Sequence, residues 1–292
     1  MRSILRLSVV AAAAAAALSA CRPDEVITTP LVPTAGVRFI NASPDTAGAY
    51  GVDFRFVDLL ENSMHFRQLF REQPTTTSGV TASVLTQYKA SNATQPRQYV
   101  VFLDDTIQSI ASTKVFTGTA NLTAGTNYTY IMWGRGRAGT LKLANWAEDV
   151  ADPGAKVALR VINATEEAID VRAFVTGATA PASPTWANVP GMSKSSYVLV
   201  DPANITYNVR RAGATTNMFA DMPALQGVKA FSSAGANGKI DTPATPGTTV
   251  AGSAISLIVY PASTPGARTP QTAAFQVPAG AFVWDRRPPS GL

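Results

Sequence analysis

Few side chains in this sequence could do chemistry, and histidine is the scarcest of them. His65 is the only histidine among 292 residues. A Ser-His-Asp relay would have to use it, and a metal site with several histidine ligands is excluded. It lies between Met64 and Phe66 with no motif partner nearby, which favours packing or a surface position. We therefore expect no catalytic residue and predict that the protein is not an enzyme.

Six aspartates could in principle supply oxygen ligands to calcium, a hard cation. They are Asp45, Asp53, Asp104, Asp105, Asp149 and Asp152. No Asp-x-Asp-x-Asp spacing occurs among them. Asp45 follows Pro44 and is typical of a turn, in which its carboxylate would accept backbone N–H bonds. We therefore predict no metal site.

Residues 134–139, Gly-Arg-Gly-Arg-Ala-Gly, have the composition of a phosphate-binding loop. Such a loop needs a following helix whose N-terminus faces the anion. Residues 140–143 are typical of a strand instead, so we expect a turn and no cofactor. The four tryptophans either line a carbohydrate platform or fill a β-sandwich core, and the core is the commoner role. They are Trp133, Trp146, Trp186 and Trp284.

The only cysteine, Cys21, ends an apolar run. It follows Leu18-Ser19-Ala20, and Arg2 and Arg6 flank the start of the run. This arrangement resembles the signal peptide of bacterial lipoproteins, in which such a cysteine is lipidated and becomes the new N-terminus. The resemblance predicts a signal peptide at residues 1–20, lipidation of Cys21 and attachment to a membrane through that lipid. The alternative is ordinary secretory cleavage with Cys21 unmodified, while the run is short for a membrane span of about 20 residues.

The predicted location is the cell envelope. Arg22 stands where an aspartate tends to mark inner-membrane lipoproteins, so the outer membrane is favoured over the inner one. Residues 21–35 are rich in proline and predict a flexible tether. The net charge of +5 falls to +3 without Arg2 and Arg6, and no dense block of lysine and arginine occurs. We expect no nucleic-acid partner. With its one cysteine lipidated, the chain has no thiol left for a disulfide.

An internal repeat organises the rest of the chain. Three segments recur in the same order, which argues for duplication: 37–43 with 159–165, 52–55 with 169–172, and 124–133 with 251–260. The predicted units are residues 36–148 and 155–287, joined by a linker at residues 147–155.

Each unit is expected to consist of about seven short strands separated by turns. In the first strand Val37 and Phe39 share one face, while Arg38 and Ile40 share the other, as in a half-buried strand. Residues 58–71 alone have helical spacing and predict a short helix or ordered loop, and a short strand is predicted at residues 275–277. The predicted fold class is all-β, with two tandem antiparallel β-sandwich domains (Ig-like or transthyretin-like) after a signal peptide and tether.

The residues Val-Arg-Phe-Ile-Asn-Ala-Ser-Pro-Asp at 37–45, Val-Asp at 52–53 and Ala-Gly-Thr-Asn-Tyr-Thr at 124–129 resemble the DUF4397 family. The resemblance implies an exported or lipid-anchored protein with one or more β-sandwich copies and no established chemistry. The second copy departs from the pattern where Ser-Pro-Asp becomes Thr165-Glu166-Glu167. No catalytic residue is carried over from the family.

Three functions remain open. The leading hypothesis is a lipid-anchored envelope protein that serves as a non-catalytic binding or structural module. The first alternative is a carbohydrate-binding or glycan-processing envelope protein, in which Asp104 and Asp105 would act together. Neighbouring residues of a strand point to opposite faces, which argues against that pair. The second alternative is a surface adhesin that binds protein partners through exposed strand edges.

Overall fold

Strands make up nearly all of the regular structure, which confirms the all-β fold class. The computed structural model describes residues 32–45, 51–61, 65–71, 87–235 and 238–289. In these residues the helical elements are short: α2 (Gln108–Ala111) and the 3-10 turn η1 (Ala273–Phe275). Cys21 and the predicted signal peptide lie outside the described residues.

The first half of the chain forms two four-stranded sheets that face each other. One sheet has, in spatial order, β4 (Lys89–Asn92), β1 (Thr34–Asn41), β7 (Asn127–Trp133) and β8 (Lys142–Ala147). The other has β3 (His65–Gln68), β2 (Val52–Phe56), β5 (Arg97–Leu103) and β6 (Lys114–Ala120). Phe54 lies at the centre of the core between them and contacts the rings of Phe39 and Tyr130.

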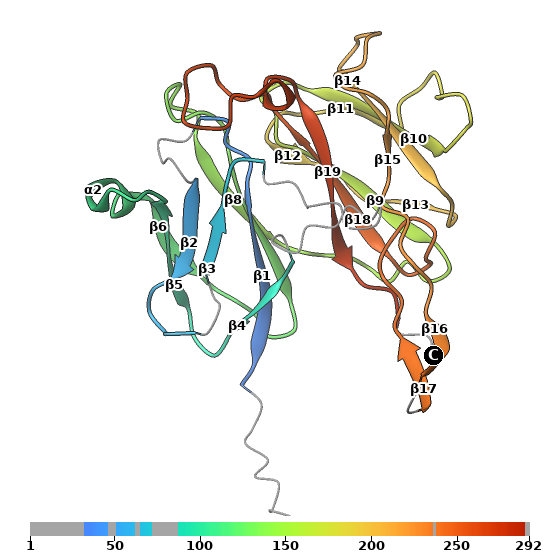
Figure 1. The fold of residues 1–292 in the computed structure, drawn as a ribbon, viewed down its shortest axis with the longest axis horizontal. Helices are drawn as coiled ribbons and strands as arrows, with labels where there is room; N and C mark the ends of the chain where they lie inside the picture. Colours follow the sequence, from blue (N-terminus) through green and yellow to red (C-terminus); the bar gives the residue numbers. More distant parts are fainter. Residues whose placement is uncertain (1–31, 46–50, 62–64, 72–86, 236–237, 290–292) are drawn as a thin grey trace, which may run out of the picture. The chain divides into compact units, whose positions relative to one another are not determined.

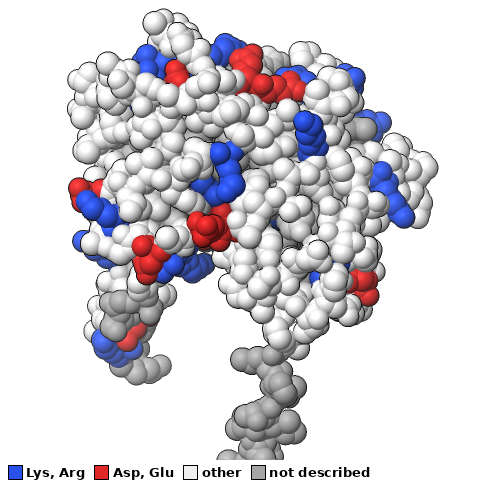
Figure 2. Space-filling model, turned by 180° about the vertical axis from the view of Figure 1, so that it is seen from behind, with Lys and Arg blue, Asp and Glu red and all other residues white. Residues whose placement is uncertain are grey.

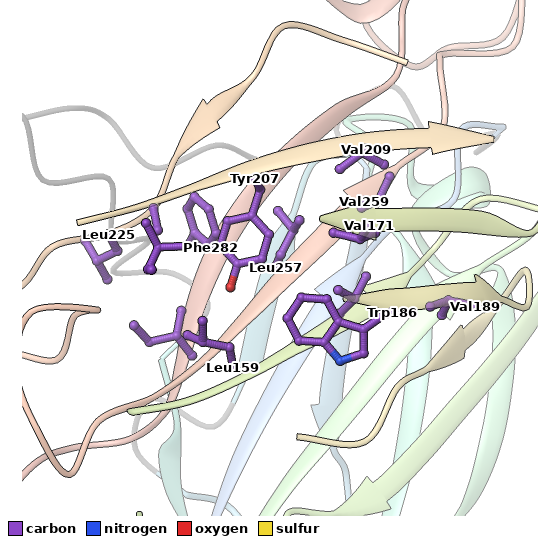
Figure 3. Close-up of a cluster of buried hydrophobic side chains, with 14 of the residues drawn as sticks. Leu159, Val171, Trp186, Val189, Tyr207, Val209, Leu225, Leu257, Val259 and Phe282 are labelled. Carbon is purple, nitrogen blue, oxygen red and sulfur yellow. The ribbon is translucent and has the colours of Figure 1, made fainter. Parts of the chain in front are cut away.

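The second half repeats this plan. Its inner sheet, which faces the first half of the chain, contains β9 (Val157–Asn163), β18 (Ala254–Tyr260) and β19 (Ala279–Arg286). On the other side of β9 it contains β12 (Ser193–Lys194) and β13 (Val198–Val200). Its outer sheet has β11 (Trp186–Val189), β10 (Ile169–Val175), β14 (Ile205–Arg211) and β15 (Met222–Pro223). Figure 3 shows the core between these sheets, with Leu159, Tyr207 and Phe282 converging on one another. A separate hairpin joins β16 (Phe231–Gly235) to β17 (Gly238–Thr242).

Two strand pairs are parallel, which a purely antiparallel sandwich does not contain. β1 pairs with β7 so that Val37 lies opposite Tyr128, and β9 pairs with β18 so that Leu159 lies opposite Ile255. A parallel pair needs a long crossover. In each half the chain between the two strands supplies it by forming the outer sheet. The register is the same in both pairs when the repeated segments are aligned.

The two inner sheets pack back to back and enclose a third hydrophobic core. It contains Ile40 and Ile131 from the first half and Ile162 and Ile258 from the second. The unit therefore has four sheet layers, which Figure 1 shows running from β2, β3, β5 and β6 on one side to β10, β11 and β14 on the other. The expected half-buried alternation of β1 is wrong, because the face that carries Arg38 and Ile40 is buried as well.

Two local predictions are corrected by the structure. Residues 58–71 contain strand β3, paired with β2, and no helix in their described part. At residues 275–277 the chain leaves η1 as a turn, with Phe275 at its end. The predicted linker at residues 147–155 lies between the end of β8 and the start of β9, and Glu148 within it carries a buried side chain that is 1% exposed. The linker proper is a turn, in which the Lys156 N–H donates to the Pro153 carbonyl at 3.0 Å.

Residues Thr34–Leu292 cluster as a single compact unit that includes both predicted sandwiches. The third core explains why, since each inner sheet covers apolar side chains of the other. No helix in the described part of the chain is long and apolar enough to cross a membrane.

Candidate functional site

The most unusual feature of the molecule is a set of four charged side chains buried between the inner sheets. We call Arg38, Arg160, Glu148 and Asp285 the buried charge cluster. Their side chains are at most 1% exposed. The cluster contains two cations and two carboxylates, so its formal charge is zero. Charged groups are rarely placed so far from water unless they are fully paired.

Every charge in the cluster contacts both charges of opposite sign. Glu148 Oε1 lies 3.1 Å from Arg38 Nη2, and Glu148 Oε2 lies 2.8 Å from Arg160 Nη2. Asp285 Oδ1 lies 3.1 Å from Arg160 Nη2 and also accepts a hydrogen bond from Arg38. Arg38 and Glu148 come from the first half, and Arg160 and Asp285 from the second. The ion pairs Arg38–Asp285 and Arg160–Glu148 therefore join the two halves.

The parallel strand pairs place a hydroxyl beside each arginine. Arg38 lies opposite Thr129 and its Nε donates to Thr129 Oγ1 at 2.8 Å. Arg160 lies opposite Ser256 and its Nε donates to Ser256 Oγ at 2.7 Å. The same backbone register thus gives the same side-chain contact in both halves.

A tyrosine ring covers each guanidinium group. The Arg38 guanidinium carbon is 4.6 Å from the centre of the Tyr88 ring, and that of Arg160 is 4.6 Å from the Tyr197 ring. Guanidinium groups stack favourably on aromatic faces, more so when water is excluded. The Tyr197 hydroxyl also donates to Asp285 Oδ2 at 2.8 Å. The two rings close the cluster from opposite halves of the chain.

The charges inside the cluster control its protonation. Burial alone would raise the pKa of Glu148, but Arg38 and Arg160, with hydrogen bonds from Arg160 and Thr129, lower it from 4.5 to about 2. Burial acts to lower the pKa of Arg160, but Asp285 and Glu148 raise it above its usual value. Burial raises the pKa of Tyr197, and the negative charge of Asp285 raises it further. Glu148 and Arg160 therefore stay charged across the neutral range.

The lowered pKa of Glu148 predicts a specific loss of stability in acid. In the unfolded chain Glu148 would ionise near the ordinary glutamate pKa of 4.5, and in the folded chain it stays ionised down to about pH 2. Its contribution is thus complete above about pH 5 and is lost as the pH falls towards 2. At about 1.4 kcal/mol per pKa unit, the lowering corresponds to about 3 kcal/mol.

We expect the difference in free energy of unfolding between wild type and Glu148→Gln to shrink by about that amount between pH 7 and pH 2. Urea denaturation at several pH values measures it. Glu167→Gln is the matched control, because Glu167 is exposed in its pair with Arg211. Parallel pH profiles for wild type and Glu148→Gln would contradict the assignment.

A third arginine, Arg71, also joins the halves, outside the buried charge cluster. Arg71 donates from Nη1 to the Val277 carbonyl at 2.7 Å and from Nη2 to the Ala274 carbonyl at 2.6 Å. Its guanidinium carbon is 4.9 Å from the centre of the Phe275 ring. Arg71 thereby fixes the segment around η1 against the first half.

Another buried arginine, Arg97, acts within the first half alone. Arg97 Nε contacts both oxygens of Asp58, and its Nη1 lies 2.7 Å from Glu61 Oε2. Phe56 lies under the guanidinium at 4.7 Å. The contact holds the segment after β2 against β5.

A family match covers three of the four residues of the buried charge cluster. Residues 35–174 match DUF4397, described as a domain of unknown function. The DUF4397 match begins in β1 and ends inside β10, so it includes Arg38, Glu148 and Arg160 but not Asp285. It confirms the resemblance seen in residues 37–57 and 124–134. No curated protein matches the chain.

Five of the six aspartates considered for calcium pair with different arginines, and the side chains of Asp45, Asp53 and Asp105 are only 3% exposed. Asp45 pairs with Arg137, Asp53 with Arg55, Asp104 with Arg67, Asp105 with Arg268, and Asp152 with Arg286. No group of three or more candidate ligands occurs among the described residues. Asp45 accepts the backbone N–H of Arg137 at 2.9 Å, so its carboxylate is a backbone acceptor, but the donor lies 92 residues away in the loop between β7 and β8. Asp104 and Asp105 pair with different arginines, and both line the same cavity beside β2 and β5.

The other candidates fall into structural roles. The loop at residues 134–139 is the turn between the antiparallel strands β7 and β8, as predicted, with Gly134 at a φ of +79°. Trp133 and Trp186 are 4% and 7% exposed, and Trp146 and Trp284 pack against the cores, which confirms the core role of the tryptophans. His65 lies in β3.

The sequence carries a signal for the buried charge cluster that a search for catalytic motifs does not reveal. An arginine occupies the second position of both repeated strands, as Arg38 and Arg160. An acidic residue closely follows a tryptophan near the end of each repeat, as Glu148 and Asp285. What the sequence does not show is that these positions from the two repeats face each other.

Proposed function

We propose that this protein is a lipid-anchored cell-envelope protein whose two DUF4397-like sandwiches, residues 36–148 and 155–287, act together as one non-catalytic binding or structural module. The outer membrane is the favoured site of attachment, through lipid on Cys21. The observation that carries the proposal is the buried charge cluster, because it makes two repeated sandwiches into a single body. A rigid body of this kind suits presentation or scaffolding.

Duplication is supported by three structural correspondences between the two halves. The parallel pairs share one register, each arginine donates to a hydroxyl on the neighbouring parallel strand, and each is covered by a tyrosine ring. Each half also contributes one carboxylate that contacts both arginines. Such reciprocal contacts are typical of a two-fold related pair of like surfaces.

The charge distribution supports a module that does not bind nucleic acid. The most deeply buried charges are paired within the protein, and the face in Figure 2 shows lysines and arginines interspersed with acidic residues. A basic surface that follows a nucleic acid would instead gather charge of one sign.

The lipid anchor is tested by replacing Cys21 in the expressed precursor. Cys21→Ala is expected to abolish incorporation of labelled palmitate, because it removes the thiol that would carry the lipid. The protein should then move from the membrane fraction to the soluble one, since stable attachment depends on the acyl chains. Ser19→Ala is the control, because alanine at that position keeps the lipoprotein signal and should leave the protein in the membrane fraction. Mass spectrometry of the mature N-terminus identifies the modified residue. Unchanged membrane attachment of Cys21→Ala would refute the anchor.

A further inference from the structure

The hairpin β16–β17 stands apart from the four sheet layers. Its strands pair only with each other within the described residues, and a bridge between Val228 and Thr245 forms its base. Phe231 is 48% exposed, and the neighbouring Ser232, Ser233 and Ala234 are exposed as well. A two-stranded hairpin without a buried face is marginally stable in water. The hairpin therefore adds little to the core of the protein, and its apolar residues are available to a partner.

The position of the hairpin relative to the start of β1 favours a lipid surface as its partner. Figure 1 shows the start of β1 and the hairpin at the same end of the unit. From Thr34 the chain continues back to Cys21 over 13 residues, a reach of about 40 Å if it is fully extended. On a chain anchored through Cys21, the link to the lipid therefore leaves the unit at the end that carries the hairpin.

The chemistry of the hairpin fits a lipid surface. Phe231 and Val228 are exposed apolar side chains, and Lys229 and Lys239 are exposed cations beside them. One acidic residue, Asp241, lies in β17 and is paired with Lys239 at 3.1 Å. Exposed aromatic and basic residues together favour the interface of a bilayer that contains anionic lipid.

We propose that hairpin β16–β17 is a membrane-contact element that inserts Phe231 into the lipid interface and so orients the anchored protein. This proposal rests on the proposed lipid anchor. The anchor supplies a high local concentration of lipid, so that a weak contact is sufficient.

The test places an environment-sensitive fluorophore on the hairpin. Lipidation of Cys21 would leave no other thiol, so Ser233→Cys can be labelled with the dye NBD selectively; Ser233 lies on the same strand face as Phe231. Ser109→Cys on α2 is the matched control, because Ser109 is also exposed and Figure 1 shows α2 away from that end. The lipidated full chain is reconstituted into vesicles of phosphatidylethanolamine and phosphatidylglycerol.

We expect NBD at position 233 to brighten by at least about twofold and to shift to shorter wavelength, while NBD at position 109 stays unchanged. Adding Phe231→Ser should remove most of the response without changing the melting temperature. Equal signals at positions 233 and 109 would overturn the proposal. A response that requires added envelope protein would also overturn it, and would assign the hairpin to a protein partner.

A second preparation separates this proposal from the anchor. Residues 22–292 carrying an N-terminal hexahistidine tag are bound to vesicles that contain a nickel-chelating lipid. In this form the fluorescence at position 233 reports on the hairpin whether or not Cys21 is lipidated in cells. If the native chain fails to sediment with vesicles, the anchor is refuted, and the tagged form still decides the role of the hairpin.

Discussion

Replacing Arg38 by methionine should lower the free energy of unfolding by about 3–5 kcal/mol. The substitution keeps an unbranched side chain of similar length but removes one of the two cations of the buried charge cluster. Glu148 and Asp285 would then share Arg160 alone and leave one negative charge buried without compensation. The loss is expected in a single cooperative transition, because the cluster belongs to both halves. Urea denaturation followed by tryptophan fluorescence measures it.

Arg211→Met is the matched control, since the Arg211–Glu167 pair is exposed on both sides and such pairs contribute at most about 1 kcal/mol. Adding Asp285→Asn to Arg38→Met restores the charge balance and should recover at least about 1 kcal/mol. If Arg38→Met and Arg211→Met cost the same, the cluster does not hold the halves together.

Replacing Ile131 by alanine should cost about 2–5 kcal/mol, through lost burial and the cavity left behind. Ile131 is fully buried in the third core, where β7 faces the inner sheet of the second half. Because the inner sheets are each supported by two cores, the surrounding structure has little freedom to collapse into the space. Ile107→Ala is the control, as Ile107 is 54% exposed before α2.

Thermal unfolding of Ile131→Ala shows whether the two halves unfold together or separately. A single transition that moves to lower temperature in Ile131→Ala shows that the third core joins the sandwiches into one cooperative unit. A separate early transition of the first half, with the second half unchanged, would contradict that interpretation.

The strands are the most predictable part of the structure, because the alternation of side chains along them reflects burial directly. The strands expected at residues 97–103, 205–211 and 255–260 are found there, and the turns at residues 134–139 and 152–154 follow from glycine and proline. Residues 58–71 differ from their prediction because their leucines and phenylalanines also fit helical spacing, and β3 is too short to show its own alternation. Local patterns of this length do not decide between strand and helix.

The candidate site is less predictable, for a different physical reason. An arginine within a strand indicates a solvent-exposed face unless its counter-charges are known. The counter-charges of Arg38 lie 110 residues away at Glu148 and 247 residues away at Asp285. The repeat reveals two copies of the arginine, but nothing in the spacing shows that the copies meet. The pairing depends on how the sheets stack.

Because each arginine of the buried charge cluster contacts carboxylates from both halves, substitutions at the four positions of the cluster depend on one another. Arg38 is neutralised in part by the second sandwich, and Arg160 in part by the first. A substitution at either arginine therefore has to be answered by a substitution in the opposite half, so these four positions are expected to change in concert.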